Sequence, residues 1–111
     1  EVREKLDCDF LGEIPHESKY KSRMAWLRRK QTDILVTNPL SGFRFVEAFR
    51  KLASRAEHHM HERKVIMVTS LMEDEGKSTV SVNLAMSLAL KHDKVLLIVV
   101  IQYCNDAIVK I

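Results

Sequence analysis

Cysteine and long hydrophobic runs are both scarce in this chain, and each scarcity excludes a class of protein. Only two of the 111 residues are cysteines, Cys8 and Cys104. They lie far apart without the spacing of a metal site, which predicts reduced thiols and a cytosolic location. The longest apolar run, VLLIVVI at 95–101, is too short to cross a bilayer as a helix. The charged stretch EVREKLDCDF lacks the apolar core of a signal peptide.

Charge of one sign is also limited, since the net charge is only +3 at pH 7. The excess lies largely in residues 19–30, KYKSRMAWLRRK, which contain six Lys or Arg and no acid. Such a run is typical of a solvated face or linker, with contact to nucleic acid or an anionic membrane as the alternative. We expect no nucleic-acid partner.

The positions of the prolines and the periodicity of the apolar residues predict a linker followed by a folded part. Residues 1–40 contain both prolines and show no sustained periodicity, so they are predicted to be a linker. Residues 41–61 are predicted to be an amphipathic helix with Ser41 as N-cap. Its apolar stripe recurs at spacings of three and four: Phe45, Phe49, Leu52 and Ala56. His58 and His61 lie one turn apart, but without a third ligand we expect a solvated helix end there.

Residues 64–101 alternate strand, helix and strand. KVIMVTS and VLLIVVI are short apolar runs, and residues 77–91 between them are apolar nearly all round. Short runs without alternation suit buried parallel strands. The sequence therefore predicts an α/β fold with a βαβ unit of parallel strands. Residues 102–111 are left as a tail, in which DAIVKI could add a third strand.

A phosphate-binding motif stands between the first strand and the helix. It consists of Gly76, Lys77, Ser78 and Thr79, the second half of a P-loop. In such a site the helix dipole and backbone N–H groups face the anion. Lys77 would hold the β and γ phosphates of ATP as the catalytic cation, Ser78 would bind Mg²⁺, and Thr79 would lie near the α-phosphate. Glu75 completes the predicted cofactor-binding set.

The motif departs from a complete P-loop in three places. Leu71 replaces the leading glycine, and residues 73–75 carry three carboxylates that must face solvent because they would repel a triphosphate. The second strand ends without the acids that hold Mg²⁺ and position a nucleophile, and the next acid is Asp106. We therefore expect a P-loop architecture without its catalytic half.

Several linked segments resemble the bacterial protein-tyrosine kinases of capsule and exopolysaccharide synthesis, whose kinase domain is a Rossmann-like P-loop ATPase. The resemblance runs from about Leu11 to Ile98 and includes LGEIPHES, NPLSGFRFVEAFRKL, VIMVTSLMEDEGKSTVSVNLAMSLA and KVLLI. It implies ATP- and Mg²⁺-dependent phosphorylation of tyrosine, largely between neighbours in a ring. It also implies a membrane-embedded polysaccharide chain-length regulator as activating partner, at the inner face of the cell membrane.

The resemblance is incomplete at two places. The family's ring contact uses a Glu-x-x-Arg-x-x-Arg motif, which Glu47 and Arg50 match and Ala53 does not. From residue 99 onward the family's Asp-x-Asp element is missing. We therefore predict half a kinase domain at 41–111, left by a frameshift or truncation in a piece of a longer protein. Alone it should be inactive and should self-associate through its uncovered faces.

Two other functions remain open from the sequence. A partitioning- or septum-site-type ATPase of the same superfamily would carry an extra Lys where this chain has Met72. Alternatively, the βαβ unit is a non-enzymatic scaffold, and the basic run with the helix at 41–61 docks a partner.

Overall fold

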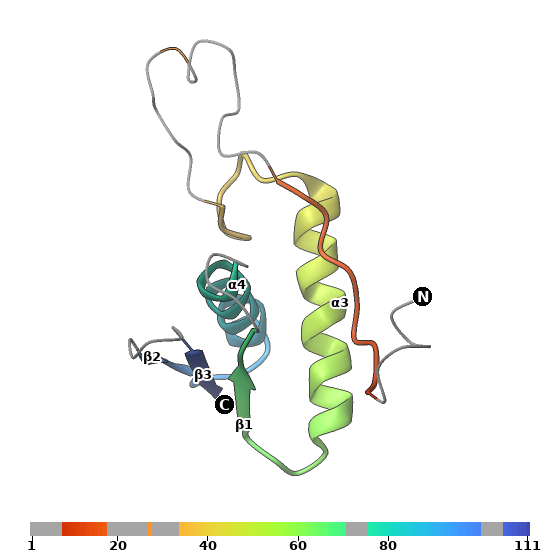
Figure 1. Ribbon diagram of the computed structural model, residues 1–111, viewed down its shortest axis with the longest axis vertical. Coiled ribbons are helices and arrows are strands. Elements are labelled where there is room, and N and C mark those ends of the chain that lie inside the picture. The colour runs from red at the N-terminus through yellow and green to blue at the C-terminus, as the bar shows by residue number, and fades with distance from the viewer. Residues whose placement is uncertain (1–7, 18–26, 28–33, 71–75, 101–105) are drawn as a thin grey trace.

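The computed structural model describes residues 8–17, 27, 34–70, 76–100 and 106–111. Its elements are α3 (Phe43–Met60), β1 (Val65–Val68), α4 (Lys77–Ala89), β2 (Leu96–Val100) and β3 (Asp106–Lys110). α4 contacts all three strands on one side and α3 on the other, so helix, helix and sheet form successive layers (Figure 1). Within the described part of the chain, no helix is long and apolar enough to cross a membrane.

The helix expected at 41–61 is present as α3. Phe45 and Phe49 are buried, with their rings edge to face and their centroids 5.0 Å apart. The predicted N-cap is wrong, because the helix is capped by Gly42 without a side-chain hydrogen bond. The Ser41 hydroxyl instead donates to the backbone oxygen of Leu35 at 2.5 Å, in the turn before the helix.

The predicted pairing of parallel strands is wrong. β3 is the central strand and pairs antiparallel with both β1 and β2, so β1 and β2 run in the same direction without being neighbours. The tail segment DAIVKI does add a third strand, but it lies between the two strands that were expected to pair. The connection at 101–105 explains the antiparallel order, because a parallel neighbour needs a crossover of a dozen or more residues. The fold is therefore a small α/β arrangement and not the parallel P-loop βαβ unit.

The core lies between α4, the sheet and α3. Leu84, Ala85 and Leu88 of α4 pack with Ala53 of α3 and Val109 of β3. In the sheet register, Ile66, Val109 and Leu97 stand in one row across the three strands and face this core. The alternate side chains lie on the opposite face, and four of them are apolar and exposed: Val65, Met67, Leu96 and Ile98. One face of the sheet is thus covered by α4, and the other presents apolar side chains to solvent.

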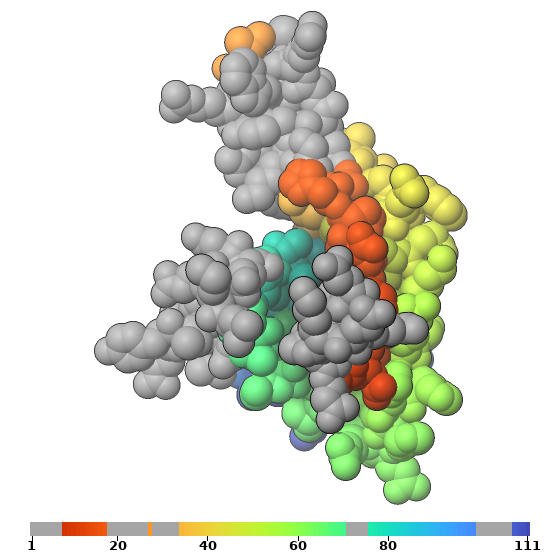
Figure 2. Space-filling view, turned by 45° about the vertical axis from the view of Figure 1, so that its right-hand side comes forward, coloured from red at the N-terminus to blue at the C-terminus, as the bar shows by residue number. Residues whose placement is uncertain are grey.

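Residues 8–17 run as an extended strap along α3 (Figure 2). Arg55 of the helix donates a hydrogen bond to the backbone oxygen of Leu11 at 2.7 Å. At the end of the strap nearest the helix start, Glu17 accepts a hydrogen bond from the Gly42 backbone N–H at 3.4 Å. Residues 8–17 of the predicted linker are therefore held against α3.

Candidate phosphate-binding site

The backbone turns sharply at Gly76, immediately before α4. Gly76 has a φ of 82° and a ψ of 17°, in the left-handed region, and it is the N-cap of the helix. A Cβ at this position would meet no atom within 4 Å, so the backbone conformation and not lack of space requires glycine. The Gly76 carbonyl accepts the first helical hydrogen bond, from Val80 N–H at 2.9 Å. This turn therefore begins the helix directly at Lys77.

Lys77 is buried although it carries a charged side chain. Only 7% of the residue is exposed, and its Nζ donates a hydrogen bond to the Ser70 hydroxyl at 2.6 Å. Ser78 and Thr79, the next two residues, are exposed. The first turn of α4 contains no acidic residue, so no carboxylate within it offsets the positive end of the helix dipole. Backbone N–H groups, two hydroxyls and an ammonium group are thus gathered at one helix start, which suits an anion.

Other predicted site residues lie elsewhere. Glu75, Leu71 and Met72 fall outside the described residues. Glu47 and Arg50 are on α3, where they form an ion pair with each other at 3.1 Å. Ala53, the departure from the ring motif, is fully buried in the core, so an arginine at this position would have to enter the packed interior. The predicted ring contact and the predicted phosphate site therefore lie on different helices, α3 and α4.

The sequence predicted no acid at the end of the second strand, and the structure shows which residues lie there. Val99 is an apolar residue of β2 that pairs with Ala107. Asp106 is several residues further along the chain, but β3 returns it to the edge where β1 ends, because Ala107 pairs with Val68. Among the described residues, no group of three His, Cys, Asp or Glu could hold a metal ion. Ser78 is therefore the one described candidate ligand for Mg²⁺ that the sequence singled out.

Asn83 was missed by sequence reasoning. It is fully buried within α4, and its Oδ1 accepts a hydrogen bond from Val36 N–H at 2.7 Å. Its Nδ2 donates to the backbone oxygens of Ile34 and Thr79, each at 2.8 Å. The signal was an amide side chain within a helix that is otherwise apolar nearly all round, because a buried amide must find hydrogen-bond partners. Asn83 fastens the segment before α3 to the helix that carries Lys77.

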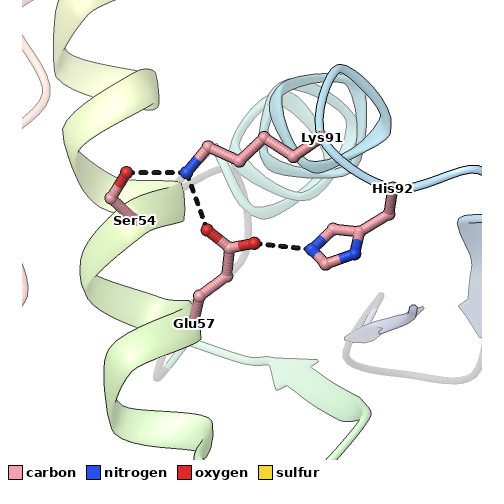
Figure 3. Close-up of polar contacts among 4 residues, drawn as sticks. All are labelled: Ser54, Glu57, Lys91 and His92. Atoms are coloured by element: carbon pink, nitrogen blue, oxygen red, sulfur yellow. Dashed lines mark hydrogen bonds and ion pairs between the residues drawn. The ribbon is translucent and has the colours of Figure 1, made fainter.

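A polar cluster joins the C-terminal half of α3 to the residues that follow α4 (Figure 3). Lys91 donates to Glu57 at 2.7 Å and to the Ser54 hydroxyl at 2.8 Å. The His92 ring lies 2.5 Å from the other carboxylate oxygen of Glu57. The hydrogen bond from Lys91 is the largest influence on Glu57 and, with the contact to His92, lowers the pKa of its carboxyl against the opposing effect of burial. The sequence could not indicate this cluster, because its members are distant along the chain.

The Glu57 cluster predicts a pH-dependent contribution to stability. Because the pKa of Glu57 is lower in the folded chain, the contribution is complete above the unfolded pKa and is lost as pH falls through the folded pKa. We expect Glu57→Gln to lower the free energy of unfolding by about 1 kcal/mol at pH 7 and by almost nothing at strongly acidic pH. Urea unfolding across this range measures the difference. Glu62→Gln, at an exposed position in the same region, is the control and should show no such trend.

Comparison with known protein families, curated proteins and solved structures gives no match to this chain. The function therefore has to be argued from the site itself. The site offers a left-handed glycine, a buried lysine and two exposed hydroxyls at the start of a helix. These groups can bind a phosphorylated ligand by hydrogen bonds and charge neutralisation.

Proposed function

We propose that this chain is the ATP-binding part of a bacterial protein-tyrosine kinase of capsule or exopolysaccharide synthesis. The observation that carries the proposal is the left-handed turn at Gly76, which places the buried Lys77 as the first residue of α4. The resemblance of residues 11–98 to that kinase family supports the same interpretation. In this proposal Lys77 neutralises the β and γ phosphates of ATP, Ser78 binds Mg²⁺, and Thr79 binds near the α-phosphate.

The proposal assigns nucleotide binding, and not phosphoryl transfer, to the isolated chain. Transfer to tyrosine needs acids that anchor the metal ion and orient the hydroxyl nucleophile. The β2 strand carries Val99 where the related kinases carry such an acid. We expect the purified chain to incorporate no labelled phosphate from ATP, whereas steady incorporation would contradict this part of the proposal. The same proposal includes a membrane-embedded polysaccharide chain-length regulator as the partner that activates the kinase.

The binding site can be mapped by NMR. Titration of the ¹⁵N-labelled chain with ATP·Mg²⁺ should shift the backbone amide signals of Gly76, Ser78 and Thr79 in a saturable manner. Adenosine, which has no phosphates, is the matched ligand control and should leave these signals in place. Shifts confined to residues remote from the start of α4 would refute the proposed site and favour a scaffold function.

We also propose that the chain self-associates through the uncovered face of its sheet. Val65, Met67, Leu96 and Ile98 are between 45% and 63% exposed on this face. Several exposed apolar side chains on one face are typical of interaction surfaces. Ile98→Lys should therefore shift the sedimentation coefficient towards that of a monomer, while Leu90→Lys, an equally apolar exposed position at the end of α4, should not. An unchanged oligomer for Ile98→Lys would exclude this face.

A further inference from the structure

Ser70 and Lys77 connect the exit of β1 to the entry of α4. Ser70 is the second residue after β1 ends at Val68, and Lys77 is the first residue of α4. Their side chains meet at 2.6 Å between Nζ and Oγ, although seven positions separate them along the chain. The sequence reasoning assigned no role to Ser70.

The contact fixes a side chain that is otherwise adaptable. Lysine has four rotatable side-chain bonds and keeps its ammonium in water at most protein surfaces. Here the residue is only 7% exposed, and the hydroxyl of Ser70 determines one direction of the ammonium group. The Ser70 hydroxyl accepts this hydrogen bond as a neutral group. An oriented lysine suits an anion site.

We propose that Ser70 is the positioning residue of the phosphate-binding site and that its hydroxyl holds the Lys77 ammonium between β1 and α4 for contact with a triphosphate. Only the identity of the ligand rests on the function proposed above. The positional part follows from the hydrogen bond and from the burial of Lys77. Prior orientation lowers the conformational entropy lost when the ligand binds, which raises its affinity.

The positional part can be tested without nucleotide. Ser70→Ala should raise the rate at which an amine-acylating reagent modifies Lys77 about tenfold, as measured by mass spectrometry of peptides, because one hydrogen bond to a charged group is lost. Ser70→Thr keeps the hydroxyl and should restore the slow rate. Lys91 follows the far end of α4 and donates hydrogen bonds to Glu57 and Ser54 of α3. It is the internal control and should react equally in all three chains. Equal modification of Lys77 in the Ala and Thr variants would overturn the inference.

The ligand part is tested by titrating ATP·Mg²⁺ into the same variants. We expect about tenfold weaker binding for Ser70→Ala and near-original binding for Ser70→Thr. Tight binding by Ser70→Ala would refute the positioning role even if the original chain binds ATP. If the original chain binds no ATP, the proposed function fails, and the acylation rates alone decide whether Ser70 positions Lys77.

Discussion

Leu88→Ala is expected to lower the free energy of unfolding by about 3 kcal/mol. Leu88 is fully buried on α4, in the cluster that contains Ala53 of α3 and Val109 of β3. Its truncation leaves a cavity where the three layers meet, and the loss of transfer free energy is increased by the lost packing. Chemical denaturation followed by circular dichroism measures the change, which is large for a chain of this size because small domains are marginally stable.

Leu90→Ala is the matched control for this prediction. Leu90 has the same side chain and directly follows α4, but it is 69% exposed. We expect its truncation to change the free energy of unfolding by less than about 0.5 kcal/mol. Similar losses for both leucines would show that the core is not centred on Leu88.

Asn83→Ala is expected to destabilise the chain by about 3 kcal/mol, since it removes three hydrogen bonds made by a buried side chain. The loss leaves the Val36 N–H and the Ile34 carbonyl without these partners. It should also act locally, by releasing the segment before α3 from α4. Amide hydrogen exchange at Val36 should therefore accelerate more than exchange within β3.

Asn83→Asp separates the two halves of this interaction. A carboxylate can still accept the hydrogen bond from Val36 N–H but cannot donate to Ile34, so we expect protection of the Val36 amide to persist in part. If Asn83→Ala leaves exchange at Val36 unchanged, the amide side chain does not fasten the segment at 34–36.

The sequence predicted α3 well because one local pattern determines it. Phe45, Phe49 and Ala56 fall on a single stripe at helical spacing, and all three are buried in the structure. The exact start could not be read in the same way, because Ser41 suits both an N-cap and a turn. Its hydroxyl donates to the Leu35 carbonyl, because a serine near a helix start can bond to the backbone of the preceding turn instead of capping the helix.

Strand pairing could not be predicted from the same kind of pattern. The two apolar runs were predicted to be strands, and the tail segment DAIVKI was named only as one that could add a third. The order of the three in the sheet depends on contacts between distant residues. The βαβ pattern favoured pairing of β1 with β2, and the tail strand took the central place instead. Periodicity identifies which residues are buried, but three short apolar strands satisfy the same periodicity in several orders.

The candidate site could be predicted in part. Gly76 and Lys77 were identified from the motif, because a helix start that binds phosphate needs a permissive backbone and a cation. Ser70 and Asn83 were not identified, since each has a role only through a partner that the fold brings near. The position of Asp106 could not be predicted for the same reason. It is distant from β1 along the chain, and only the pairing of β3 with β1 brings it beside the end of β1.

Isothermal titration of the chain with ATP·Mg²⁺, beside Lys77→Ala and Lys64→Ala, tests the central claim most directly. Lys64 is an exposed lysine next to β1 and serves as the control for loss of one positive charge. The account predicts one saturable site in the original chain, about 100-fold weaker binding for Lys77→Ala, and little change for Lys64→Ala. Equal affinity of the original chain and Lys77→Ala, or no binding by the original chain, would contradict it.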